Sequence, residues 1–119
     1  MPVSRSLDTT VSSLMPALKA ELAQLVALPS ISAPDCPEET RGALLEAHDL
    51  VLELFRDAGV EELDSLHLPD TAPVIRGELP GPPGAPTVLL YSHYDVVPAG
   101  DEGEWRNAGS PPVSSSRRL

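Results

Sequence analysis

Residues 86–100, PTVLLYSHYDVVPAG, decide the predicted fold. Residues 88–91 form a continuous apolar run, which predicts a strand that other elements cover on both faces. The run leads to His93 and Asp95, and a Val-Pro-Ala-Gly turn follows. Because side chains alternate along an extended chain, His93 and Asp95 point to the same side. A carboxylate often holds a metal-binding imidazole in place, so the pair is a candidate metal site, although ordinary loops contain the same spacing.

Two helices are predicted upstream of this strand. The first has apolar residues three and four positions apart on one face, and it ends before Pro29. Pro16 fits poorly inside a helix, so we expect the regular part to begin near Met15, with Pro16 in its first turn. The second helix is predicted over residues 38–58, and Gly59 is a natural stop. The apolar face of the first helix consists of Val11, Leu14, Leu18, Leu22 and Leu25.

Two further strands are predicted between the second helix and the apolar run. They are residues 61–68, EELDSLHL, and residues 72–79, APVIRGEL, and a turn-rich LPGPPGAP connector follows. The order of two helices and three strands fits the start of an α/β or α+β domain, and we assign the α/β class with both helices packed on a small partial sheet. Residues 106–119 lack apolar periodicity and predict a disordered tail.

The composition of the chain narrows the possible partners. The chain has 119 residues, of which 41% are apolar, and a formal net charge of −10. This acidity argues against a nucleic-acid partner, since a phosphate-binding face needs lysine and arginine. Cys36 is the single cysteine, so an intrachain disulfide is excluded. The N-terminal residues lack the apolar segment of a signal peptide, and no membrane-spanning stretch is present, so we expect a cytoplasmic protein with no membrane partner.

The longer stretch VLLYSHYDVVPAGDEGEW resembles the first metal-binding motif of a family of dizinc amidohydrolases. This family includes the aminoacylases, the carnosinase-type dipeptidases, glutamate carboxypeptidase and succinyl-diaminopimelate desuccinylase. The motif has a histidine and an aspartate two residues apart, then a Val-x-Pro turn and a tryptophan, which are His93, Asp95, the turn at Val97 and Pro98, and Trp105 here. Upstream, ELAQLVALPSIS resembles the family's first helix running into its Pro-Ser-x-Ser loop, and ALLEAHDLVLELFRDAGV resembles its second helix. The dipeptidase branch is the most similar.

The resemblance implies the N-terminal part of a three-layer zinc-peptidase domain. Two zinc ions in the complete enzyme would activate a water for hydrolysis of a dipeptide or an N-acyl amino acid. His93 matches the histidine that binds one zinc ion, and Asp95 matches the aspartate of the catalytic machinery that supports this histidine. The family also needs a bridging aspartate, a glutamate as general base and further metal ligands.

None of these later motifs follows Trp105 in this sequence, so whether this chain is itself an enzyme stays open. We expect residues 1–105 to be an incomplete catalytic domain and residues 106–119 a tail foreign to the family, produced by a frameshift, an early stop or a misplaced gene boundary. The chain alone is then expected to be inactive and to bind zinc weakly. His48 and His67 are predicted to be packing or surface residues, and Cys36 a passive thiol. The alternative is a small non-catalytic binding or interaction module.

Overall fold

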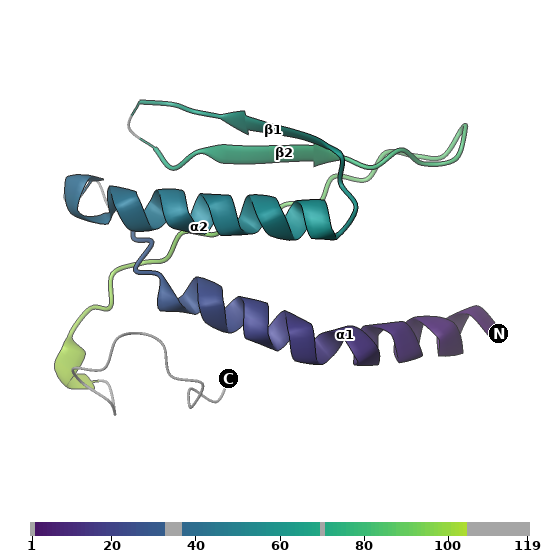
Figure 1. The fold of residues 1–119 in the computed structure, drawn as a ribbon, viewed down its shortest axis with the longest axis horizontal. Coiled ribbons are helices and arrows are strands. Elements are labelled where there is room, and N and C mark those ends of the chain that lie inside the picture. Colours follow the sequence, from purple (N-terminus) through teal and green to yellow (C-terminus); the bar gives the residue numbers. More distant parts are fainter. Residues whose placement is uncertain (1, 33–36, 70, 105–119) are drawn as a thin grey trace.

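The computed structural model describes residues 2–32, 37–69 and 71–104. Two helices come first and a two-stranded antiparallel sheet follows (Figure 1), which confirms the predicted α/β arrangement. The predicted tail, Trp105 and Cys36 lie outside the described residues. The elements are α1 (Pro2–Ala27), α2 (Pro37–Asp57), β1 (Glu62–Leu66), β2 (Val74–Glu78) and a short 3₁₀ turn, η1 (Glu102–Glu104).

Helix α1 is longer than predicted and contains Pro16 in its interior. The expected start near Met15 is therefore wrong. An interior proline removes one backbone hydrogen bond and crowds the carbonyl one turn earlier, which kinks or breaks a helix. The ribbon of α1 changes direction near its middle (Figure 1). Its apolar face stays largely exposed, with Leu14 58% and Leu18 53% accessible.

Helix α2 follows its prediction within a residue at each end. Pro37 occupies the first helical position, where its missing N–H costs nothing, and Glu38 and Glu39 lie in the first turn, where the helix dipole favours negative charge. At the other end, Gly59 has a φ of 90°, and its N–H donates to the Arg56 carbonyl. A glycine in this left-handed conformation ends a helix without steric cost, so the sequence signal for the stop is confirmed.

Helix α2 lies against the sheet and supplies most of the described core. Leu44 and Ala47 of α2 are buried together with Val60, which follows the Gly59 turn. Figure 1 shows α2 running beside the two strands. Both strands were predicted, and they pair antiparallel so that Leu63 faces Gly77 and Ser65 faces Ile75. Leu63, Ser65 and Ile75 are partly buried, as expected for the sheet face that a helix covers.

Residues 88–91 correct the sequence prediction. They form neither a strand nor a helix, and Val88, Leu89, Leu90 and Tyr91 are 73%, 90%, 89% and 85% exposed. A strand buried on both faces needs a neighbour at its edges and elements above and below it. In the described part of the chain the sheet ends at β2, and no element covers this segment. The apolar run therefore crosses the structure as an extended, uncovered connection.

No helix within the described ranges is both long enough and apolar enough to cross a membrane.

Candidate functional site

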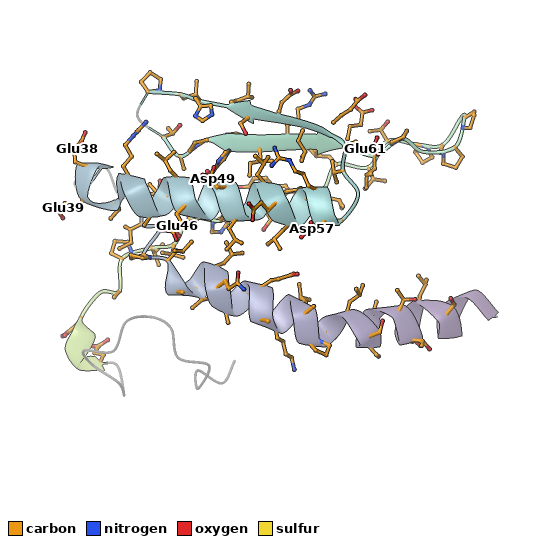
Figure 2. All side chains as sticks on the ribbon, in the orientation of Figure 1. Glu38, Glu39, Glu46, Asp49, Asp57 and Glu61 are labelled. Atoms are coloured by element: carbon orange, nitrogen blue, oxygen red, sulfur yellow. The ribbon has the colours of Figure 1, made fainter. Side chains whose placement is uncertain are left out.

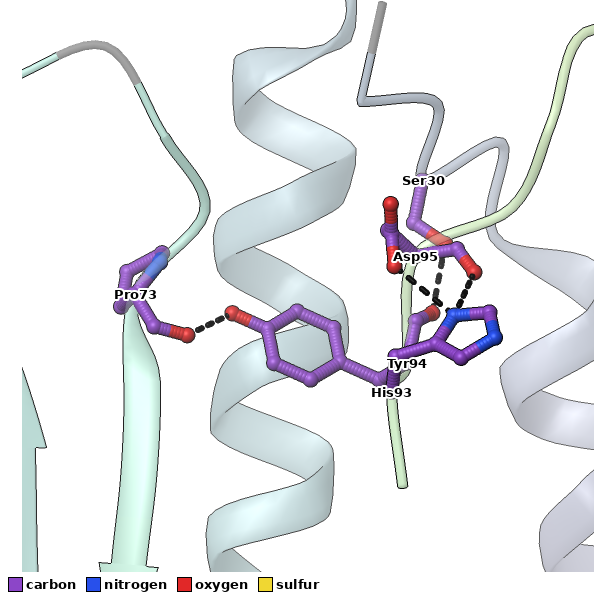
Figure 3. Close-up of polar contacts among 5 residues, drawn as sticks. All are labelled: Ser30, Pro73, His93, Tyr94 and Asp95. Atoms are coloured by element: carbon purple, nitrogen blue, oxygen red, sulfur yellow. Dashed lines mark hydrogen bonds and ion pairs between the residues drawn. The ribbon is translucent and has the colours of Figure 1, made fainter. Parts of the chain in front are cut away.

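The candidate site is the turn formed by His93 and Asp95, which Figure 3 shows in close-up. His93 Nδ1 lies 2.9 Å from Asp95 Oδ1 and 3.1 Å from the backbone oxygen of Asp95. The sequence analysis paired these two residues, and the structure brings their side chains into contact. The His93 side chain is 68% exposed and that of Asp95 37% exposed, so the imidazole stands at the surface with the carboxylate behind it.

This contact determines which nitrogen of His93 is free. Both oxygens near Nδ1 are acceptors, so Nδ1 carries the hydrogen and donates it to Asp95. The neutral ring then has its lone pair on Nε2, for which the described residues show no hydrogen-bond partner. A neutral imidazole with one nitrogen held by a carboxylate is the usual arrangement of a metal-binding histidine. His93 therefore presents one coordination position to solvent.

The backbone of this turn is held by Ser30, which follows α1. Ser30 is completely buried, and its hydroxyl donates to the Tyr94 carbonyl at 3.3 Å. Its own carbonyl accepts a hydrogen bond of 2.9 Å from the N–H of Val96. Ile31 and Val96 form an isolated parallel bridge beside these bonds. One short stretch after α1 therefore fixes the peptide groups on both sides of Asp95.

The Tyr94 side chain anchors the same turn from the opposite side. Its hydroxyl donates a hydrogen bond to the carbonyl of Pro73, just before β2 (Figure 3). Burial raises the pKa of the Tyr94 phenol above its usual value, and the negative charge of neighbouring Asp95 adds to this effect. The phenol is therefore protonated at neutral pH and available as the donor that the Pro73 carbonyl requires.

His48 adjoins the site without offering a metal-binding atom. Its Nδ1 lies 2.9 Å from Asp49 Oδ1 and its Nε2 lies 2.8 Å from Ser65 Oγ, so both ring nitrogens have partners. The ring packs edge-on to Tyr94, with centroids 6.4 Å apart, and lies 5.8 Å from the ring of His67. His48 thus joins α2 to β1 and to the site, as the packing interpretation predicted.

Sequence reasoning singled out His93 and Asp95 but not the residues that hold them. Ser30 and Tyr94 act through hydrogen bonds to positions 64 and 21 residues away in the sequence. The Pro-Ser-x-Ser loop that contains Ser30 was the one available signal, because it belongs to the family resemblance.

The described residues fit part of a metal site. No cluster of three or more histidine, cysteine, aspartate or glutamate side chains that could hold a metal occurs among them. Figure 2 shows the labelled acidic residues spread along α2 and the turn after it. A catalytic zinc ion usually has three protein ligands. Among the described residues, His93 has the free nitrogen that could serve as one such ligand, and Asp95 orients its ring.

Comparisons with known proteins support a relation to metallodipeptidases. The chain is 32% identical to a Cys-Gly metallodipeptidase of Schizosaccharomyces pombe over 93 residues, which cover 71% of this chain and 19% of that protein. It is also 32% identical to a Cys-Gly metallodipeptidase of Candida albicans over 120 residues, which cover 89% of this chain and 23% of that protein. The chain thus spans about a fifth of the length of these relatives. No family model matches, and no solved structure matches.

Proposed function

We propose that this chain carries the first metal-binding segment of a metal-dependent dipeptidase, in which His93 is a zinc ligand and Asp95 its supporting carboxylate. The observation that carries the proposal is the contact between His93 Nδ1 and Asp95, which leaves Nε2 free at the surface. The similarity to two Cys-Gly metallodipeptidases supports it independently. Cys-Gly is accordingly the first substrate to test, with other dipeptides and N-acyl amino acids after it.

The proposed roles follow from the chemistry of the two side chains. His93 contributes a neutral nitrogen, which is the form of imidazole that binds a metal ion. Asp95 accepts the hydrogen bond from His93 Nδ1 and so keeps the lone pair of the imidazole on Nε2, which faces solvent. His93, oriented by Asp95, would help to hold a zinc ion, which would supply Lewis acidity toward the scissile carbonyl and toward a water molecule. The single cysteine of the sequence is compatible with a reducing compartment such as the cytoplasm, which we propose as the location.

We further propose that the 119-residue polypeptide has no hydrolase activity by itself. No residue of the sequence matches the family's general-base glutamate or its bridging aspartate. The described residues also lack a third metal-binding side chain near His93. Without a positioned proton acceptor, general-base catalysis loses its typical contribution of about 10²- to 10⁴-fold.

A chimera tests the ligand role. The matched segment of the Schizosaccharomyces pombe dipeptidase is replaced by the corresponding residues of this chain, and Cys-Gly hydrolysis is measured with added zinc. We expect activity in the chimera, its loss in His93→Ala, and a fall of about 10- to 100-fold in Asp95→Asn. His67→Ala is the matched control, because His67 is an exposed histidine of the same chain away from the His93–Asp95 contact.

A folded chimera whose activity survives His93→Ala would refute the proposal. If the chimera shows no cooperative thermal transition, the same variants are examined in the 119-residue chain. There, added zinc chloride should shift the nuclear magnetic resonance signal of the His93 Nε2 nitrogen more than that of either other histidine. Equal shifts at all three histidines would also refute the ligand role.

A further inference from the structure

We propose that Ser30 is a positioning residue that sets the tautomer of His93. The proposal rests on the function proposed above, in which Nε2 of His93 must carry the lone pair. The starting observation is that Ser30 is completely buried and yet bonds to backbone groups 64 and 66 residues further along the chain, at Tyr94 and Val96. Its side chain and its main chain each contribute one of these bonds.

The two hydrogen bonds enclose Asp95. The Ser30 hydroxyl fixes the carbonyl before Asp95, and the Ser30 carbonyl fixes the N–H after it. Both acceptors of the His93 Nδ1 hydrogen, the carboxylate and the backbone oxygen, belong to Asp95. A rotation of the Asp95 backbone would therefore displace both acceptors at once. The two Ser30 hydrogen bonds oppose this rotation. Figure 3 shows the Ser30 side chain beside the turn.

Ser30 is connected to both helices through the residues beside it. Its N–H donates to the Leu28 carbonyl at 2.8 Å, directly after α1. The next residue, Ile31, bridges to Val96 and accepts a hydrogen bond of 2.6 Å from the Thr40 hydroxyl in α2. The two hydrogen bonds that restrain Asp95 therefore come from a loop that is itself attached to α1 and α2. A precisely oriented ligand requires such support from rigid elements of the fold.

The consequence is a defined chemical state of His93. When Asp95 holds the Nδ1 hydrogen, the lone pair lies on Nε2, and the ring is ready to bind a metal ion without rearrangement. When the Asp95 acceptors move away, the hydrogen can occupy either nitrogen. Loss of the Ser30 hydroxyl should therefore change the tautomer ratio of a residue that Ser30 does not touch.

The test measures this ratio directly in the 119-residue chain. Two-bond ¹H–¹⁵N correlations of the imidazole rings, which distinguish the two neutral tautomers from the imidazolium, are recorded in mildly alkaline buffer. In the natural chain we expect the His93 hydrogen on Nδ1. In Ser30→Ala the ratio of the Nδ1–H form to the Nε2–H form should fall by about three- to tenfold, which corresponds to the loss of one hydrogen bond. Asp95→Asn should change the ratio as a positive control.

Ser32→Ala is the matched control, because Ser32 is an exposed serine of the same loop. It should leave the ratio unchanged. If Ser30→Ala does not fold, Ser30→Cys keeps the shape with a weaker donor and should lower the ratio in the same direction. A folded Ser30 variant with the natural tautomer ratio would overturn the proposal, even if its thermal stability fell, because Ser30 would then serve packing alone.

This readout separates the inference from the proposed function. The tautomer ratio is measured without metal or substrate, so it can change in Ser30→Ala even if His93 proves not to be a metal ligand. Conversely, the chimera can depend on His93 for activity while Ser30→Ala leaves the tautomer ratio unchanged. That result would support His93 as a metal ligand and would show that Ser30 does not set its tautomer.

Discussion

The exposed segment at residues 88–91 makes a sharp prediction about stability. Leu90 is 89% exposed, whereas Leu44 in α2 is 8% exposed, although both are leucines in apolar stretches of the sequence. In this structure, Leu90→Lys removes almost no buried contact, whereas Leu44→Ala opens a cavity in the small core. If residues 88–91 instead form the two-sided buried strand that the sequence predicts, Leu90→Lys buries a charge.

The expected magnitudes differ widely. A surface substitution such as Leu90→Lys should change the free energy of unfolding by no more than about 0.5 kcal/mol. Truncation of a buried leucine typically costs about 2–5 kcal/mol. The total stability of a domain is about 5–15 kcal/mol, so Leu44→Ala should remove a large part of it. At roughly 3–6 °C per kcal/mol for a chain of this size, the two variants should melt at clearly separated temperatures.

The assay is a thermal melt followed by circular dichroism, combined with analytical ultracentrifugation. Leu90→Lys should retain the melting temperature of the natural chain and should reduce self-association, because a charge within an extended apolar segment opposes pairing between molecules. Leu44→Ala should lower the melting temperature or abolish the cooperative transition. Equal destabilisation by both substitutions would refute the exposed position of residues 88–91 and would restore the buried strand.

Three further predictions follow from single contacts. A Cβ at position 77 would lie 2.7 Å from Val60 Cγ1 and 2.8 Å from Leu63 Cδ2, so Gly77→Ala should lower the free energy of unfolding by about 1–3 kcal/mol. Gly42 in α2 has open space around it, so Gly42→Ala should raise the free energy of unfolding slightly. Chemical denaturation measures both changes. Because the pKa of Tyr94 is raised in the folded state, this phenol ionises first in the unfolded chain, above a pH of about 10. The free energy of unfolding should therefore fall as the pH rises there, and Tyr94→Phe should reduce that fall. An identical alkaline stability profile in the natural chain and in Tyr94→Phe would contradict the prediction. Zinc should bind the 119-residue chain with a Kd weaker than about 1 µM by calorimetry, because a catalytic site needs about three protein ligands, and tighter binding that His93→Ala abolishes would show that further ligands exist.

The elements that sequence reasoning predicted correctly are those specified by local patterns. The apolar periodicity of α2 and the Gly59 stop both act within a few residues along the chain. The two strands β1 and β2 likewise need only each other and one helix to cover them. Each signal could therefore be read without knowledge of distant parts of the chain.

The incorrect predictions depended on what surrounds an element. A continuous apolar run signals a strand only if other elements cover it, and residues 88–91 have no such cover in the described structure. A helix start near Met15, with Pro16 in the first turn, is predicted because a proline disfavours the helix interior, but α1 continues through Pro16. The positioning role of Ser30 also depends on distant residues. Its hydrogen-bond partner Tyr94 lies 64 residues further along the chain, and no local sequence pattern indicates a hydrogen bond between residues so far apart.

The site combines a local contact between His93 and Asp95 with long-range hydrogen bonds from Ser30 and Tyr94. His93 and Asp95 are two residues apart, so their contact forms even though the strand that should deliver them is unpaired. A local contact alone leaves the turn free to change its backbone conformation, because nothing within the turn fixes the peptide groups beside Asp95. Ser30 and Tyr94 supply that restraint from the end of α1 and from the residue before β2. The sequence motif therefore determines which atoms meet, and the long-range hydrogen bonds determine how firmly the free nitrogen of His93 is held toward solvent.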